Sequence, residues 1–86
     1  MSVTEEIKKL SREDGFFIGT DQTAKYLRVG KVKKVYVASN CKEETKVDLE
    51  HYAKLANVEL IQLDENNEEL GVLCKKPFRI SVLGLK

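Results

Sequence analysis

The run Val35-Tyr36-Val37-Ala38 lies near the middle of the 86-residue chain and consists of four consecutive apolar side chains. Its residue types favour a β-strand. Successive side chains of a strand point to opposite faces of the sheet, so this run is apolar on both faces. That pattern is typical of a strand that helices cover on each side. The run therefore predicts a layered α/β domain with a buried central strand.

Helix and strand patterns alternate on the amino-terminal side of this strand. Apolar residues over 3–10 recur at helical spacing and predict a helix, and Phe16-Phe17-Ile18 predicts a short strand. Thr20 is a suitable cap for a second helix, which Gly30 is expected to end.

The alternation continues on the carboxyl-terminal side. A helix is predicted around 49–56, a strand over 58–63, a short helix around 70–74 that Pro77 prevents from continuing, and a last strand over 80–85. A chain of this length supports one core, so residues 1–86 are expected to form a single domain. The predicted architecture is a three-layer α/β/α sandwich with a four-stranded sheet.

Composition and cysteine usage favour an intracellular protein. No apolar run approaches the ~18 residues of a membrane span, and the first residues lack the basic and apolar segments of a signal peptide. Cys41 and Cys74 form no CxxC pair, which favours a reducing compartment. We expect a soluble cytoplasmic protein with no membrane partner and with both thiols buried. A single disulfide or a metal site is the alternative.

Charge is unevenly distributed along a chain whose net charge is only +1. The stretches 22–42 and 71–86 contain no acidic residue and hold ten of the 15 basic residues. If folding brings the two stretches together, the protein acquires a basic face suited to phosphate. The alternative is a charge-segregated surface without a ligand.

Two segments carry features of a ligand site. Gly19-Thr20-Asp21-Gln22-Thr23 joins a strand to a helix, where backbone N–H groups and the helix dipole attract anions, although an ordinary capped helix is the simpler interpretation. Lys75-Lys76-Pro77-Phe78-Arg79 places an aromatic ring among cations on a turn. That arrangement suits an unstacked base and its phosphates. A core position for Phe78 at the entrance of the last strand is the alternative.

Catalytic interpretations have less support. His51 is the only histidine, and its helical position beside Glu50 predicts a surface residue. A thiol–imidazole pair of Cys41 and His51 has no local signature to support it. The carboxylates of 64–69 have the wrong spacing for a metal cage and predict an acidic loop. We expect no catalytic residue, no metal site and no cofactor.

Three collinear blocks of the chain resemble a known family. They run from Gly19 to Asn40, from Asp48 to Ala56, and from Asn67 to Gly71 and then Cys74 to Ser81, the last part containing Lys75-Lys76-Pro77-Phe78-Arg79. In order and spacing they resemble the kink-turn-binding ribosomal protein superfamily (the L-seven-Ae group), in particular its L-thirty-e branch of the archaeal and eukaryotic large subunit.

The resemblance implies an RNA-binding protein without enzymatic activity. Members bind kink-turns or related internal loops, in which a sharp bend exposes bulged bases. Phe78 would stack on a flipped-out nucleotide, and Asp21 is compatible with nearby phosphate only where it accepts from a base edge. The positions that the resemblance places near RNA are Gly19, Thr20, Asp21, Gln22, Lys25, Arg28, Lys33, Asn40, Lys76, Pro77, Phe78 and Arg79.

These positions carry a prediction about topology. Gly19 and Asn40 follow strands, whereas Phe78 precedes one. The three can share one edge of the sheet only if the last strand runs antiparallel to the first two. We therefore predict a mixed sheet with an antiparallel last strand.

The expected function is that of a structural RNA-binding protein of the large ribosomal subunit. The expected partners are ribosomal RNA with a kink-turn-like motif and other ribosomal proteins, and the protein is expected to be a monomer outside the ribonucleoprotein. One alternative is an accessory protein of another ribonucleoprotein or a stand-alone RNA binder. Alternatives of other classes are a protein-interaction module and a small thiol enzyme.

Overall fold

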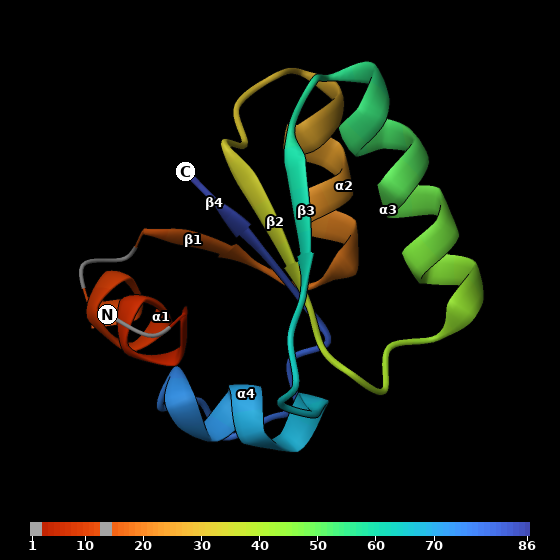
Figure 1. Ribbon diagram of the computed structural model, residues 1–86. Coiled ribbons are helices and arrows are strands. Elements are labelled where there is room, and N and C mark those ends of the chain that lie inside the picture. The colour runs from red at the N-terminus through yellow and green to blue at the C-terminus, as the bar shows by residue number, and fades with distance from the viewer. Residues whose placement is uncertain (1–2, 13–14) are drawn as a thin grey trace.

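The chain alternates helix and strand along its length, as a computed structural model shows for residues 3–12 and 15–86 (Figure 1). Ile7 of the first helix is fully buried. The side chains of Val3 and Leu10, which the helical spacing assigns to the same face, lie outside the described part of the structure. The elements are α1 (Val3–Arg12), β1 (Phe16–Ile18), α2 (Thr20–Arg28), β2 (Lys34–Val37), α3 (Glu43–Leu55), β3 (Glu59–Gln62), α4 (Asn67–Leu73) and β4 (Val82–Leu85).

The four strands form one mixed sheet in the order β1-β4-β2-β3. β4 lies between β1 and β2 and is antiparallel to both, with Ile18 opposite Leu83 and Val37 opposite Val82. β2 and β3 are parallel. The mixed sheet predicted from the sequence is therefore confirmed, and its last strand occupies an inner position.

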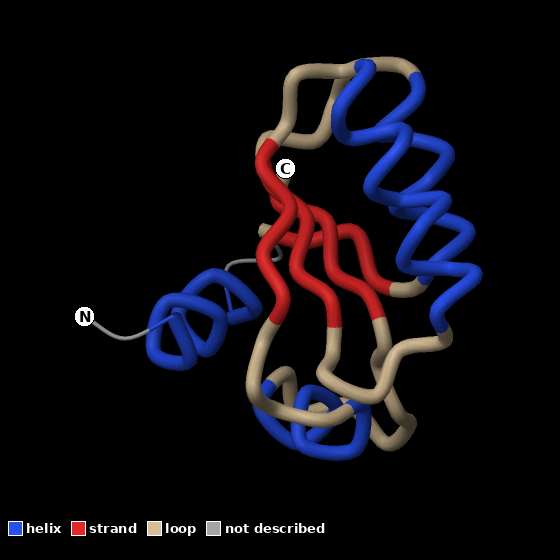
Figure 2. The backbone as a smooth tube through the Cα atoms, turned by 45° about the vertical axis from the view of Figure 1, so that its right-hand side comes forward, coloured by secondary structure: helices blue, strands red, loops and turns tan. Residues whose placement is uncertain are grey.

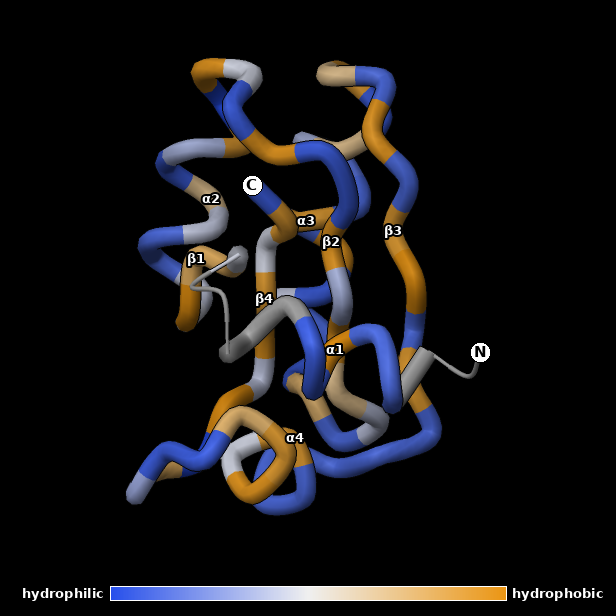
Figure 3. The backbone as a smooth tube through the Cα atoms, turned by 90° about the vertical axis from the view of Figure 1, so that its left-hand side faces the viewer, coloured by the Kyte–Doolittle hydropathy of each residue, from blue (hydrophilic) through white to orange (hydrophobic). Residues whose placement is uncertain are grey.

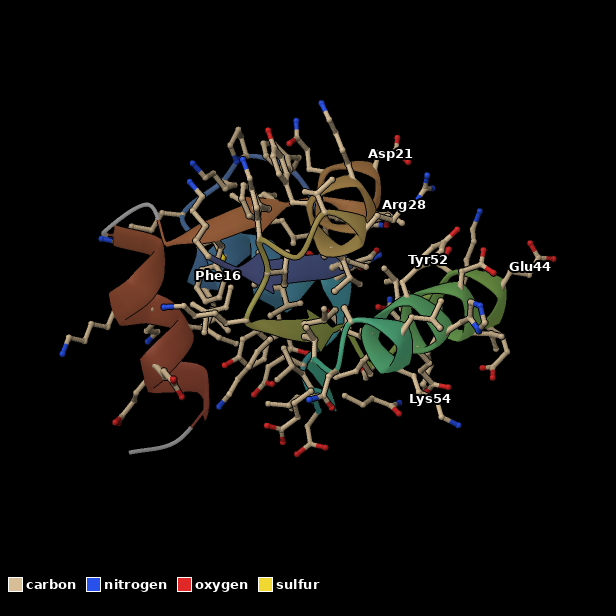
Figure 4. The ribbon with its side chains drawn as sticks, turned by 90° about the horizontal axis from the view of Figure 1, so that it is seen from above. Phe16, Asp21, Arg28, Glu44, Tyr52 and Lys54 are labelled. Atoms are coloured by element: carbon tan, nitrogen blue, oxygen red, sulfur yellow. The ribbon has the colours of Figure 1, made fainter. Side chains whose placement is uncertain are left out.

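Helices cover both faces of the sheet, α2 and α3 on one side and α1 and α4 on the other (Figure 1). β2 supplies both cores: Val35 and Val37 pack under α2 and α3, and Tyr36 packs with Ile7 and Phe16 on the opposite side. Phe16 lies between α1 and the sheet (Figure 4) and meets the Tyr36 ring edge to face at 5.8 Å. Apolar residues concentrate on the strands and polar ones on the connections (Figure 3). The double-sided burial predicted for this strand is confirmed.

The ends of three helices share one hydrogen-bond pattern. After α2, Gly30 N donates to Leu27 O and the next N–H donates to Tyr26 O. The same pair of bonds follows α3 and α4, where the residue in the left-handed conformation is Asn57 (φ 57°) or Lys75 (φ 56°). This is the Schellman arrangement, which satisfies carbonyl groups at a helix end. Gly30 ends its helix in the predicted way.

Several boundaries differ from the sequence-based expectation. Thr20 is the first residue of α2 and not its cap, a position that Gly19 takes. β4 begins at Val82, because the N–H of Ile80 bonds to Asn67 O and not to a neighbouring strand. No helix within the described residues is long and apolar enough to cross a membrane.

Candidate RNA interface

The carboxyl ends of β1 and β2 meet the amino end of β4 at one edge of the sheet. Gly19 N donates to Val82 O at 3.0 Å, and Ala38 N donates to Ser81 O at 2.8 Å. The segments after β2 and before β4 lie beside α4, and the short connection after β1 leads into α2 at the same end of the sheet (Figure 2). Because β4 is antiparallel, the segment before it reaches the same edge as the segments after β1 and β2. We call this the α4 edge.

The start of α2 lies at the α4 edge. Gly19 adopts φ 100°, a conformation that L side chains rarely adopt, and no side-chain hydrogen bond caps the helix. A Cβ at Gly19 would meet nothing within 4 Å, so its backbone is open to an approaching ligand. Asp21 and Gln22 are exposed in the first turn. The first N–H groups of α2 are thus available to an anion, because Gly19 has no side chain that could accept from one of them.

Asn40 lies at the same edge, where its side chain bonds to the start of α4. Its Oδ1 accepts from Asn67 N at 2.9 Å, and its Nδ2 donates to Asn67 Oδ1 at 3.2 Å. Asn66 caps α4 in a capping box with Glu69. The amide of Asn40 therefore already serves an intramolecular contact, and one N–H of its Nδ2 is left for a ligand.

The turn between α4 and β4 presents its side chains to solvent. Phe78 is 54% exposed, although large apolar side chains are usually buried. Lys76, Pro77 and Arg79 are exposed beside it. The core position considered for Phe78 is therefore wrong, because the chain buries Ile80 in its place. The arrangement leaves an open aromatic face with cations on both sides.

Two predicted positions, Lys33 and Arg28, lie away from the α4 edge, and a third, Lys25, lies between them and the start of α2. Lys33 precedes β2, and its N–H donates to Leu85 O at the opposite end of the sheet, roughly 17 Å along the strand from Ala38. Arg28 ends α2, and its guanidinium lies 5.0 Å from the centre of the Tyr52 ring of α3 (Figure 4). Lys25 is exposed part-way along α2. The acid-free stretches therefore do not form one face, because folding divides their cations between two ends of the sheet.

The described residues give no support to a catalytic site. His51 is exposed on α3 about 12 Å along the helix from Glu43, which excludes a pair with Cys41 ahead of that helix. Burial raises the pKa of the Cys41 thiol, which opposes nucleophilic chemistry. Neither cysteine is in a disulfide, and Cys74 is buried as predicted whereas Cys41 is only half-buried. No group of three or more described His, Cys, Asp or Glu residues is placed to hold a metal.

Comparison with known proteins identifies the family. The model of the ribosomal protein L7Ae/L30e/S12e/Gadd45 family matches residues 1–86. The chain belongs to this family. Large ribosomal subunit protein eL30 of Sulfurisphaera tokodaii is 40% identical over 80 residues, which cover 93% of this chain and 76% of that protein. The eL30 protein of Saccharolobus solfataricus is 38% identical, over 93% of this chain and 74% of its own length.

Solved structures agree with the family at the level of the fold. A protein of unknown function from Bacillus halodurans superimposes with a TM-score of 0.89 at 22% identity, over 96% of this chain and 82% of that one. A Giardia lamblia 15.5 kD RNA-binding protein superimposes with a TM-score of 0.81 at 15% identity, over 96% and 69%. The L7Ae/L30e family assignment and the α/β architecture predicted from the sequence are both confirmed.

Sequence reasoning missed two residues that shape the α4 edge in this family member. Asn67 joins the end of β2 to the start of α4, and Gly71 lies buried in the middle of α4 against the Phe78 turn. A glycine inside a helical pattern is the one signal that pointed to Gly71, since glycine disfavours a helix interior unless close packing requires it.

Proposed function

We propose that this protein is a structural RNA-binding component of the large ribosomal subunit that recognises a kink-turn or a similar bulged internal loop. Membership of the L7Ae/L30e family and the 40% identity to an eL30 protein support the ribosomal role. The observation that carries the choice of surface is the exposed Phe78 ring, which shares the α4 edge with Gly19 and Asn40. The proposed partners are ribosomal RNA and neighbouring ribosomal proteins in the cytoplasmic ribosome, and the protein is a monomer outside it.

The α4 edge offers each part of a bent RNA a different contact. The N–H groups at the start of α2, together with the helix dipole, bind a backbone phosphate next to Gly19. Phe78 stacks on a base that the bend has expelled, and Lys76 and Arg79 neutralise the adjacent phosphates. Asp21 and Gln22 face the purine pairs of the bend, where the carboxylate accepts from a base amino group. Asn40 offers one N–H donor to the RNA.

This division of contacts explains why a bent RNA is the preferred ligand. A regular A-form helix keeps its bases stacked, so it has no exposed base on which Phe78 can stack. It offers only its phosphates, which the cations can bind. The proposed affinity therefore has a general part, which depends on charge and salt, and a specific part, which depends on the expelled base.

Titration with a short kink-turn RNA and with a matched RNA that cannot bend tests the proposal. We expect the bent RNA to bind at least tenfold more tightly at 200 mM salt, where the general part is weakened. Phosphate contacts should account for a larger share of the binding free energy of the unbent RNA than of the bent RNA, and added salt should therefore remove a larger share of it. Equal affinity for both RNAs, or no measurable binding at 50 mM salt, contradicts the proposed function. Co-sedimentation with large ribosomal subunits tests the ribosomal assignment separately.

A further inference from the structure

The backbone of the Phe78 turn lies directly against the middle of α4. A Cβ at Gly71 would meet the carbonyl oxygen of Phe78 closer than real Cβ atoms approach any heavy atom. It would also lie 3.2 Å from the Phe78 carbonyl carbon and 3.5 Å from the Cα of Arg79. All three atoms belong to the backbone, so a side chain at position 71 cannot be accommodated by a rotamer change. The turn itself would have to move.

Glycine is otherwise a poor residue for this position. Gly71 is buried in the interior of a seven-residue helix, where alanine would favour the helical conformation more strongly. Two hydrogen bonds hold the entrance of the turn to the same part of α4: Lys76 N donates to Gly71 O at 2.9 Å, and Lys75 N donates to Val72 O at 3.0 Å. The absence of a side chain at Gly71 and these two hydrogen bonds together fix how closely the backbone of the turn approaches α4.

The exit of the turn is held by Asn67. Ile80 N donates to the Asn67 carbonyl at 3.0 Å, and the Asn67 backbone and side chain both bond to Asn40 at the end of β2. The first and last residues of the turn are therefore both bound to α4, through Gly71 and Asn67. Phe78 lies between these two points and is itself exposed.

We infer that Gly71 and Asn67 are positioning residues that hold the Phe78 ring at the height and angle needed to stack on an expelled base, without touching the RNA themselves. The inference rests on the proposed function, because stacking on an expelled base is what requires the turn to hold a fixed position. Rotamer freedom of one exposed ring is a small cost of binding, whereas displacement of the whole turn removes the stacking geometry.

The test compares Gly71→Ala, Phe78→Ala and the double variant by titration with the short kink-turn RNA. Gly71→Ala should lower affinity by roughly five- to fiftyfold, within the range that one stacked base contributes. In the Phe78→Ala background the same substitution should change affinity by less than about twofold, because the ring that it misplaces is already absent. Val72→Ala is the matched control: it lies next to Gly71 on α4, is 72% exposed, and should bind like the wild type.

A measurement without RNA separates displacement of the turn from general damage. The chain has three phenylalanines, so their ring signals can be assigned by NMR. Gly71→Ala should shift the Phe78 signals and leave those of Phe16 and Phe17 unchanged. If that variant does not fold, Asn67→Ala is the second variant: it keeps the carbonyl that accepts from Ile80 N and removes only the side-chain bond from Asn40 Nδ2. It should shift the Phe78 signals and lower affinity by a few fold, and most of that loss should disappear when Phe78 is already alanine.

Three outcomes are distinguishable. Failure of the wild type to prefer the bent RNA contradicts the proposed function. A wild type that prefers bent RNA, together with Gly71→Ala or Asn67→Ala variants that bind equally well, overturns the positioning role alone. The positioning role is also overturned if Gly71→Ala or Asn67→Ala causes the same loss of RNA affinity with and without the Phe78 ring. The substituted residue and Phe78 would then affect RNA binding independently.

Discussion

Lys75 occupies a backbone conformation that suits glycine. It has φ 56° at the end of α4, where α2 has Gly30 and α3 has Asn57 in the equivalent place. Asparagine tolerates this region, whereas other L residues are strained in it by about 1–2 kcal/mol. Such strain gathers at functional sites, and Lys75 is exposed three residues before Phe78. We therefore propose that the charge of Lys75 serves RNA binding.

Lys75→Gly should improve stability and weaken RNA binding at once. Relief of strain exceeds the added entropy of the unfolded chain, about 0.4–1 kcal/mol, so the free energy of unfolding should rise slightly. RNA affinity at low salt should fall, and the log–log salt slope should decrease by roughly 0.7–0.9 if one phosphate contact is lost. Asn57→Gly is the control, because Asn57 has nearly the same φ as Lys75 but is not among the predicted RNA contacts. An unchanged salt slope in Lys75→Gly would show that its charge plays no part in binding.

Phe78→Ala separates stacking from packing. The ring is 54% exposed, so its removal should cost the fold much less than the roughly 3–5 kcal/mol of a buried phenylalanine. Affinity for the bent RNA should fall by roughly ten- to a hundredfold, which corresponds to about 1–3 kcal/mol. Leucine should restore little, because it lacks a flat π-face. Thermal melting and titration of the same samples check both parts, and a large fall in melting temperature with normal affinity would refute the assignment.

At the scale of elements, the segments that follow α2 and α4 place their cations at different ends of the sheet. The turn after α4 carries Lys76 and Arg79 at the α4 edge. The end of α2 leads to Lys33, which is held by Leu85 O at the far end. Strand direction decides this separation. Lys33 precedes β2 and Asn40 follows it, so the length of the strand lies between Lys33 and the α4 edge.

Lys76→Ala and Lys33→Ala therefore form a matched pair, since each removes one positive charge from an exposed lysine. Lys76→Ala should weaken binding of a short kink-turn RNA and reduce its salt slope by about one phosphate contact. Lys33→Ala should leave that RNA nearly unaffected, and neither should change stability beyond about 0.5 kcal/mol. Equal losses in both variants would show that net charge, and not the α4 edge, determines the affinity.

For the whole molecule, the inner position of β4 makes the carboxyl terminus essential to the fold. β4 pairs with both β1 and β2, so it connects the amino-terminal strand to the rest of the sheet. Gly84 lets α2 approach closely, since a Cβ there would lie 2.9 Å from Thr23 Cγ2. Leu83 and Val82 are fully buried, one in each core.

Truncation after Ser81 should therefore abolish folding and not merely loosen one edge. The shortened chain would leave β1 without its partner strand and would expose both cores to water. Circular dichroism and proteolysis should show an unfolded chain without preference for bent RNA. Removal of Lys86 alone is the control and should preserve the fold. A truncated chain that unfolds cooperatively would contradict this role of β4.

Much of the fold and part of the site follow from local sequence. The apolar run at Val35–Ala38 identifies a strand with two covered faces because strand side chains alternate between faces. Gly30 ends α2 through backbone geometry that the residue itself carries, whereas α4 ends at Leu73, ahead of Pro77. The antiparallel last strand, by contrast, is predicted only because the family resemblance places Gly19, Asn40 and Phe78 at one edge. For the central strand and the end of α2, neighbouring residues decide the outcome.

Other features depend on contacts between distant segments. The residues around Phe78 leave open whether Phe78 or Ile80 enters the core, and the fold buries Ile80 whereas Phe78 is 54% exposed. Gly71 appears as a defect in a helix until the Phe78 carbonyl is seen against it. Lys33 belongs to the same basic stretch as Lys25, yet strand direction carries it to the far end of the sheet. Local sequence determines the elements, whereas the packing of α4 against the turn and the path of each strand determine which side chains can meet one RNA.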